Sequence, residues 1–270
     1  MIQKANFHTH CLYCDGKNTP EEMVQSAIRK GFTALGFSSH GYAEPDKECD
    51  MPLSRVEDYR REILALREKY RGQLRIFCGI EQDYYGESDP TEFEYCIGSV
   101  HLVKKDGRFI SVDHSRGRQE EAVEALYGGD WMAFAEDYFD TVGRLCEAFT
   151  PNLIGHFDLI TKFNEGEDGY LLFDETAPRY LDAAEKALRK LIPHHVPFEI
   201  NTGAIARGYR KTPYPGPALL EMIRDMGGTF VYSSDCHNAD FLDCGWEQVL
   251  KLAEEYRLEL TDFPLPEANL

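Results

Sequence analysis

The sequence predicts an α/β protein whose strands close into a seven-stranded (β/α)7 barrel of the TIM type, with a metal site at the C-terminal ends of the strands. Runs of β-type apolar residues alternate with helical patterns along the chain, which indicates parallel strands joined by right-handed crossovers. About seven strands can be counted, one short of the regular barrel. Histidines and carboxylates follow most of these strands, at the end where such barrels build their sites.

The first predicted strand spans residues 4–10 and is followed by a helix with a clear start. Thr19 can cap this helix, Pro20 fits its first position, Glu22 completes a capping box, and Gly31 ends it. The other predicted strands cover residues 33–38, 74–81, 95–101, 152–156, 197–201 and 229–234. The other predicted helices cover residues 54–70, 131–149, 176–192, 217–226 and 244–256.

Composition limits the domain structure and the partners. The chain has 270 residues, of which 43% are hydrophobic, and shows no repeat or flexible linker, so we expect a single barrel domain over residues 1–270. A formal charge of −18 and a pI near 4.9 argue against nucleic-acid and anionic-membrane partners. No segment is apolar enough to span a membrane, and the first residues lack the apolar core of a signal peptide. The eight cysteines therefore indicate reduced thiols and a cytoplasmic location.

Two motifs place pairs of polar side chains on one face of a strand. His8 and His10 are two residues apart, so both imidazoles point to the same side, toward the barrel axis. Asp235 and His237 repeat this spacing after the last strand. Asp15 lies in the loop after His10, where it could reach back toward the strand or simply form a turn.

A single carboxylate, Glu81, ends the most apolar strand. A buried unpaired charge is costly, so we expect this side chain to be paired or bound to metal. It belongs to a set of six histidines and three carboxylates at strand ends: His8, His10, Asp15, His40, Glu81, His101, His156, Asp235 and His237. A doubly wound open sheet would spread these residues over its width, because neighbouring strands lie about 4.8 Å apart, whereas a closed barrel brings them to one point. The barrel is therefore preferred.

The order of these motifs resembles the PHP (polymerase and histidinol phosphatase) family, whose motifs begin with His-x-His and end with Ser-Asp-x-His. The resemblance covers essentially the whole chain and implies a distorted seven-stranded barrel. It further implies three divalent or trivalent metal ions, and His and carboxylate ligands suit Zn, Fe and Mn alike. The implied ligand groups are His8, His10, Glu81 and Asp235 for the first metal, Glu81, His101 and His156 for the second, and Asp15, His40 and His237 for the third.

Within the family, the chain is most similar to the stand-alone members that hydrolyse L-histidinol phosphate to L-histidinol and phosphate in histidine biosynthesis. The implied mechanism is attack on phosphorus by a hydroxide that bridges the metals. A charge count favours a small phosphorylated substrate. Three divalent ions would bring about six positive charges, and Asp15, Glu81 and Asp235 cancel half of them, so a hydroxide and a phosphate dianion would neutralise the remainder.

Two basic residues and three proton donors are candidates for handling the phosphate ester. Lys162 and Arg207 follow the fifth and sixth strands, where each could bind phosphate or remain a surface charge. Arg210, near Arg207, is expected at the surface. The general acid for the leaving alkoxide is open, and the candidates are Asp158, Asp113 and His114.

Two other functions remain open. One is another hydrolase on the same ligands, either a phosphodiesterase or nucleotidase of the family or a barrel amidohydrolase. Amidohydrolases commonly bridge their metals with a carboxylated lysine, whereas this chain has Glu81 at that position. The other is a binding or proofreading-type module like those in polymerases, which the complete ligand set disfavours.

Overall fold

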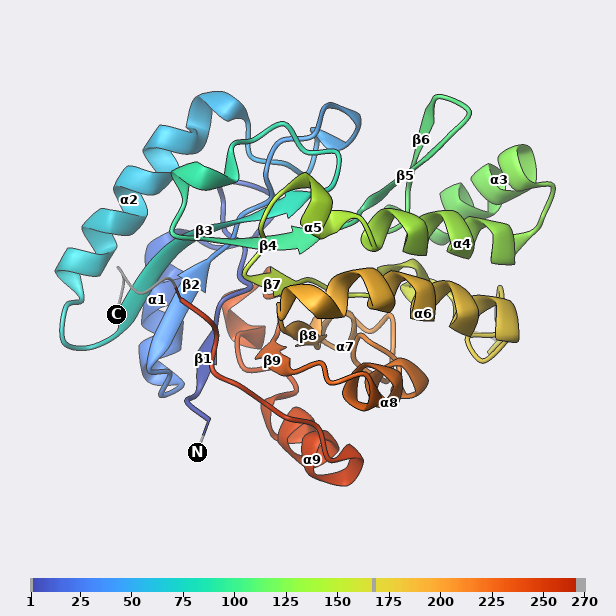
Figure 1. Ribbon diagram of the computed structural model, residues 1–270. Coiled ribbons are helices and arrows are strands. Elements are labelled where there is room, and N and C mark those ends of the chain that lie inside the picture. Colours follow the sequence, from blue (N-terminus) through green and yellow to red (C-terminus); the bar gives the residue numbers. More distant parts are fainter. Residues whose placement is uncertain (1, 167–168, 266–270) are drawn as a thin grey trace.

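Seven parallel strands form one sheet that nearly closes into a barrel (Figure 1). The structure is a computed structural model that describes residues 2–166 and 169–265. In sheet order the strands are β1 (Ala5–Asn6), β2 (Ala34–Phe37), β3 (Arg75–Asp83), β4 (Tyr95–Ser99), β7 (Leu153–Ile154), β8 (Phe198–Asn201) and β9 (Phe230–Ser233). The predicted barrel is therefore confirmed.

The seam of the barrel lies between the segments that follow β1 and β9. It is formed by a parallel bridge between Thr9 and Cys236. The His10 amide donates to the Cys236 carbonyl at 2.9 Å, and the Cys236 amide donates to the His8 carbonyl at 3.2 Å. The barrel therefore closes through the two segments of the chain that contain predicted ligands.

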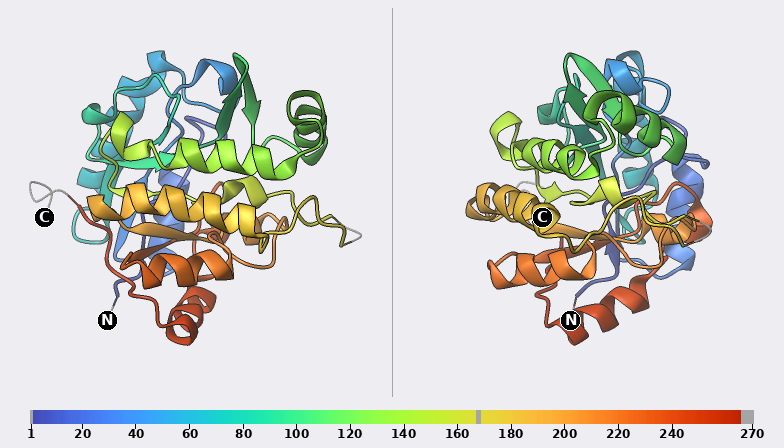
Figure 2. Two further views of the ribbon diagram at one scale, coloured as in Figure 1. Left: turned by 45° about the vertical axis from the view of Figure 1, so that its right-hand side comes forward. Right: turned by 90° about the vertical axis from the view of Figure 1, so that its right-hand side faces the viewer.

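Helices cover the outside of the sheet, and α4, α6 and α8 lie side by side on one flank (Figure 2). The helices in the crossovers are α1 (Pro20–Arg29), α2 (Val56–Lys69), α4 (Trp131–Val142), α5 (Leu145–Ala148), α6 (Pro178–Leu191), α8 (Pro217–Asp225) and α9 (Trp246–Tyr256). The capping box of α1 is confirmed, since Thr19 Oγ1 accepts from the Glu22 amide and Glu22 Oε2 accepts from the Thr19 amide. The helix predicted over residues 131–149 is interrupted at Gly143 and Arg144.

An antiparallel hairpin interrupts the strict alternation expected from the sequence. It consists of β5 (Leu102–Lys105) and β6 (Arg108–Ser111), and α3 (Arg116–Tyr127) follows it. Its turn, Asp106-Gly107, has two positive φ angles of 48° and 79°, the conformation that favours Asp-Gly in two-residue hairpins. A short helix, α7 (Gly203–Ala206), follows β8. Both additions border the cavity described below.

Two strands are shorter than predicted because side chains take over their backbone hydrogen bonds. The His8 amide donates to Asn6 Oδ1 at 3.1 Å, and β1 ends before it. The His156 amide donates to Glu199 Oε2 at 2.8 Å, and β7 ends two residues earlier. At these two points the backbone leaves the hydrogen-bond ladder of the sheet, and His8 and His156 point toward the barrel axis.

The barrel is apolar at one end and polar at the other. The apolar part is a cluster of buried side chains that lie on six of the seven barrel strands or close to them: Phe7, Ala34, Phe77, Tyr95, Ile97, Leu153, Val231 and Phe263. The Tyr95 hydroxyl ties this group together by donating to the carbonyls of Phe7 and Phe37.

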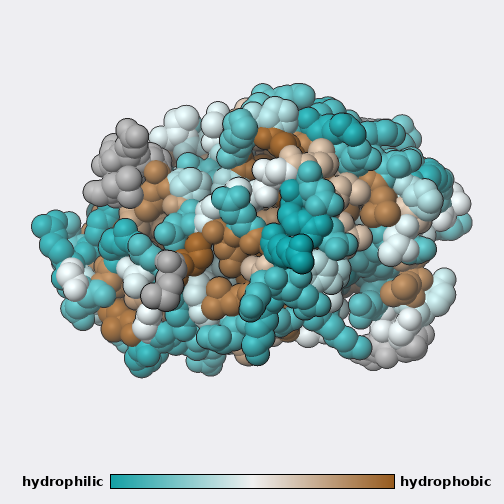
Figure 3. All heavy atoms as spheres, turned by 60° about the horizontal axis from the view of Figure 1, so that its bottom comes forward, coloured by the Kyte–Doolittle hydropathy of each residue, from teal (hydrophilic) through white to brown (hydrophobic). Residues whose placement is uncertain are grey.

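Hydrophilic residues predominate on the face of the molecule that Figure 3 shows, and its hydrophobic patches are small and separated. In the described part of the chain no helix combines the length and hydropathy that a membrane crossing requires.

Candidate metal centre

The nine predicted ligands gather at the C-terminal ends of the strands. His8 and His10 follow β1, His40 follows β2, and Glu81 lies in β3. The remaining donors come after β4, β7 and β9, except that Asp15 reaches the group from a loop. Their side-chain atoms form three connected clusters. We call these the inner cluster (His8, His10, Glu81, Asp235), the middle cluster (Glu81, His101, His156) and the outer cluster (Asp15, His40, His237).

The inner cluster is buried and its donor atoms face one another. Glu81 Oε2 lies 3.1 Å from His8 Nε2 and 3.5 Å from His10 Nε2. Asp235 Oδ1 lies 3.7 Å and 3.2 Å from the same two nitrogens. Within the described ranges, His8 Nε2, His10 Nε2 and Glu81 Oε2 have no hydrogen-bond partner. Buried polar atoms are rarely left in this state. Nitrogen and oxygen donors at such separations fit around an ion that binds each at about 2.0–2.2 Å, so the residues fit a metal.

Glu81 connects the inner cluster to the middle cluster through its second oxygen. Glu81 Oε1 lies 2.9 Å from His156 Nε2 and 3.5 Å from His101 Nε2. Glu81 Oε2 also lies 2.9 Å from His40 Nδ1, so this one carboxylate faces imidazoles of all three clusters, which is the arrangement of a bridging ligand.

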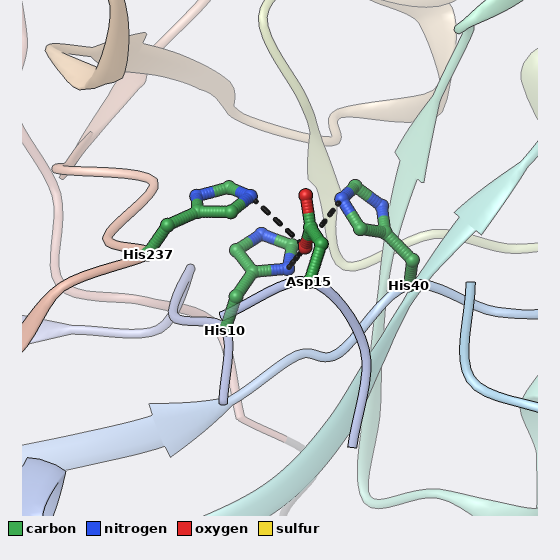
Figure 4. Close-up of side chains that lie close together, drawn as sticks. All are labelled: His10, Asp15, His40 and His237. Carbon is green, nitrogen blue, oxygen red and sulfur yellow. Dashed lines mark ion pairs between the residues drawn. The ribbon is translucent and has the colours of Figure 1, made fainter. Parts of the chain in front are cut away.

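The outer cluster surrounds Asp15 and is partly exposed (Figure 4). Asp15 Oδ1 lies 3.2 Å from His237 Nε2, 3.7 Å from His40 Nε2 and 4.0 Å from His10 Nδ1. The His10 ring stacks on the His237 ring with centroids 4.0 Å apart. His10 thus presents one nitrogen to the inner cluster and the other to the outer cluster.

Charges around the inner cluster keep its carboxylates ionised. Burial by itself raises the pKa of the Glu81 carboxyl, but the charges of His8, His40 and His101 hold that pKa well below its usual range. Burial also raises the pKa of the Asp235 carboxyl, but the nearby positive charges, with that of Arg207 the largest, hold that pKa well below its usual range. Both side chains are therefore acceptors only.

The backbone around Asp235 is shaped for close approach. Asp235 has a φ of 45°, a left-handed conformation that is uncommon for a residue other than glycine. Gly203 lies against it, and a Cβ atom there would come within 2.8 Å of Asp235 Oδ2 and 2.9 Å of Arg207 Nη2. The absence of a side chain at Gly203 is what lets Arg207 reach Asp235.

A cavity of about 560 Å³ opens above the clusters, and both predicted phosphate-binding residues line it. Lys162 Nζ donates to the Asp113 carbonyl at 3.0 Å and lies 3.4 Å from Asp113 Oδ2. Arg207 contacts Asp235 Oδ2 at 3.0 Å and His237 Nδ1 at 2.9 Å. These contacts fix two cations on the cavity wall beside the candidate ligands.

The three candidate acids are placed differently. Asp113 and His114 line the cavity, on the segment that follows the β5–β6 hairpin. Asp158 lies outside the lining and is fully buried, with Oδ2 accepting from the Gly216 amide at 2.9 Å. Its burial raises the pKa of this carboxyl to about 7. Burial opposes ionisation of Asp113 too, but Lys162 and His101 bring the pKa of that carboxyl below its usual range.

Arg210 corrects one expectation from the sequence. Its side chain is 5% exposed rather than at the surface, and it forms a two-pronged ion pair with Glu175 at 2.7 and 3.0 Å. It also donates to the Thr161 carbonyl at 2.8 Å. A guanidinium can be buried when a carboxylate accepts two of its hydrogen bonds in this way. Through the Thr161 carbonyl, Arg210 also holds in place the segment that contains Lys162.

Sequence reasoning missed a buried carboxylate on β8. Glu199 Oε1 lies 2.6 Å from His8 Nδ1, behind the inner cluster. The available signal was a glutamate inside the apolar run Phe198–Asn201, where a charge needs partners.

Comparisons with known proteins agree with this geometry. The model of the PHP domain family matches residues 6–203. The probable histidinol-phosphatase of Schizosaccharomyces pombe is 29% identical over 252 residues, covering 85% of this chain and 79% of the relative. The histidinol-phosphatase of Bacillus subtilis is 25% identical and covers 93% of this chain and 99% of its own length. The crystal structure of histidinol phosphate phosphatase from Lactococcus lactis, complexed with Zn, L-histidinol and phosphate, has a TM-score of 0.71 at 19% identity and covers 96% of each chain. At that identity the likeness supports the fold.

Proposed function

Because the chain belongs to the PHP domain family, we propose that it is a metal-dependent phosphomonoesterase that hydrolyses L-histidinol phosphate to L-histidinol and phosphate. The observation that carries the proposal is the convergence of nine donor residues, with orphaned buried donor atoms among them, beneath a cavity with two basic side chains. Two curated relatives that the chain matches over 79% and 99% of their length are named for this activity, the first as a probable histidinol-phosphatase. We take residues 1–270 as one PHP-type domain.

The three clusters would hold three metal ions, with Glu81 shared between the inner and middle clusters. Imidazole and carboxylate donors suit Zn, Fe or Mn. When bound, such ions lower the pKa of coordinated water and neutralise charge on the transferring phosphoryl group.

Lys162 and Arg207 bind the phosphate oxygens in this proposal. The Arg207 guanidinium is oriented by Asp235, and its Nε has no hydrogen-bond partner among the described residues. Lys162 keeps donor capacity because an ammonium has three protons and its hydrogen bonds among the described residues are both with Asp113. The two side chains come from different loops, so they can hold a phosphate from two directions.

His114 is the proton donor that the cavity favours for the leaving alkoxide. Asp113 stays ionised beside Lys162 and has no proton to give at neutral pH. Asp158 lies outside the cavity lining. Histidine is the side chain that most often transfers protons in catalysis, and His114 is an exposed residue of the lining.

The setting we propose is a reducing compartment, the cytoplasm. All eight cysteines are free, including Cys11 and Cys14 beside the clusters. Thiols persist in this state where glutathione and thioredoxin keep them reduced.

Phosphate release from L-histidinol phosphate by metal-loaded protein tests the function. A dinucleotide phosphodiester and a small lactam serve as the matched alternatives, and elemental analysis gives the metal content of the same samples. We expect turnover of histidinol phosphate and about three metals per chain. Preferred cleavage of the diester would make the protein a phosphodiesterase, and fewer than two metals under replete conditions would contradict the assigned centre.

A further inference from the structure

Strand β8 contributes no donor to the three clusters, unlike the other six strands of the described barrel. It instead carries Glu199, whose exposed fraction is 0%. Glu199 and Asn201 are two residues apart and project to the same side of the strand. Their polar groups form a layer behind the inner and middle clusters.

Both oxygens of Glu199 are occupied by groups that belong to the candidate metal centre or support it. Oε1 lies 2.6 Å from His8 Nδ1. Oε2 accepts from the His156 backbone amide at 2.8 Å and from Asn201 Nδ2 at 2.9 Å. Asn201 Oδ1 in turn accepts from the Gly203 amide at 2.8 Å. A chain of hydrogen bonds thus runs from His8 to the turn at which Arg207 meets Asp235.

The contact with Glu199 decides which nitrogen of His8 carries the proton. A carboxylate only accepts hydrogen bonds, so His8 Nδ1 must carry a proton. The lone pair of a neutral His8 is then on Nε2, which faces the carboxylates of Glu81 and Asp235 at 3.1 and 3.7 Å. A lone pair facing carboxylate oxygens without a hydrogen bond is repulsive unless a cation lies between them. The tautomer set by Glu199 is therefore the metal-binding one.

Glu199 also ties two clusters to one rigid strand. His8 belongs to the inner cluster and His156 to the middle cluster, and Glu199 contacts one through its imidazole and the other through its backbone. Because β8 pairs with β9 over four residues, the strand ladder holds the Glu199 backbone in place. The two hydrogen bonds of its carboxylate then connect both histidines to this strand.

We propose that Glu199 is a positioning residue of the metal centre, which holds the protonated Nδ1 of His8 and the backbone of His156 so that metal is retained in the inner cluster. The proposal rests on the metal-dependent function above. It predicts that loss of the Glu199 carboxylate weakens metal retention, whereas loss of an ion-paired carboxylate away from the clusters does not.

The experiment compares Glu199→Gln with Glu175→Gln. Both substitutions are isosteric and remove a hydrogen-bonded carboxylate, but Glu175 pairs with Arg210, has a side chain that is 24% exposed and lies outside the cavity lining. Each variant and the wild type are loaded with Zn, dialysed against a weak chelator and analysed for metal per chain and for the rate of release to a chromophoric chelator. For Glu199→Gln we expect one equivalent to be lost, with affinity reduced by about 10–100-fold, and for Glu175→Gln wild-type retention. Wild-type metal content and release rate in Glu199→Gln would overturn the proposal.

A measurement on the wild type covers the case in which Glu199→Gln does not fold. Nitrogen-15 NMR of the Zn-loaded protein reports which imidazole nitrogen of His8 carries a proton, and we expect Nδ1. Protonation at Nε2 would refute the proposal. The assays also separate the two ideas: if Glu199→Gln loses metal while histidinol phosphate is not hydrolysed by the wild type, the proposed substrate is wrong and the role of Glu199 stands. If the wild type turns over substrate and both variants keep their metal, only the role of Glu199 is wrong.

Discussion

The inner and outer clusters use the same kinds of donor but differ in their access to water. The side chains of His8, His10 and Glu81 are 0% exposed, whereas those of Asp15, His40 and His237 are 34, 14 and 16% exposed. An exposed donor that loses its metal can bind water, but a buried one is left with unpaired polar atoms. From this difference in burial we infer that the inner ligands are coupled to folding more tightly than the outer ligands. We expect the inner metal to be part of the folded structure and the outer metal to exchange.

The largest effect should come from Glu81, because it belongs to both buried clusters. Glu81→Ala leaves the imidazoles of the inner and middle clusters without their shared carboxylate. We expect loss of at least two metals per chain and a fall in kcat of about 10³-fold, which corresponds to about 4 kcal/mol. Elemental analysis with phosphate-release kinetics measures both. Retention of two metals would show that the buried clusters do not depend on a bridging carboxylate.

A smaller effect is expected from Asp235→Asn, which changes the inner cluster alone. The amide keeps the shape of the side chain but removes the charge that faces His10 and Arg207. We expect loss of one metal and a decrease in the free energy of unfolding of about 1–3 kcal/mol, because buried partners lose a charged acceptor. Urea denaturation at fixed metal concentration checks this. An unchanged unfolding midpoint would break the link between burial and stability.

Asp15→Asn is the matched substitution in the outer cluster. It should also remove one metal, but the free energy of unfolding should stay within about 0.5 kcal/mol, because Asp15 is solvent-accessible. The same denaturation series measures this difference directly. A destabilisation equal to that of Asp235→Asn would mean that exposure does not distinguish the two clusters.

The smallest expected effect is kinetic and can be measured first on the wild type. Metal release from the wild type to excess chelator should occur in at least two phases, with the outer equivalent leaving first. Asp15→Asn should lack the fast phase and leave the slow phase unchanged. A single phase for all metals in the wild type would show that the clusters exchange as a unit.

The candidate donors could be chosen from the sequence because strand ends and a two-residue periodicity are local properties. His8 and His10 lie on one side of their segment for the same reason that Asp235 and His237 do, and barrel closure brings the pairs together. Glu199 escaped notice because its role depends on a partner 191 residues away, across strands whose spatial order the pattern does not reveal. The same limit applies to Asp158, which is close to His156 in sequence but faces Gly216.

The inserted hairpin shows a second kind of limit. Asp106-Gly107 is a local turn signal, but the regular alternation of strands and helices concealed it. The segment that follows the hairpin brings Asp113 and His114 to the cavity, and Lys162 reaches Asp113 from another loop. Contacts of this kind follow from how loops pack over the barrel, so they were visible only in the structure.

The seam between Thr9 and Cys236 has a consequence for the order of events during synthesis. The inner cluster takes His8 and His10 from one side of this seam and Asp235 from the other, so its donors come from opposite ends of the sheet order. A nascent chain on the ribosome presents the first two early, but no complete inner site exists until β9 has emerged and docked. A chain truncated before β9 would therefore lack Asp235 and could not assemble the proposed inner site.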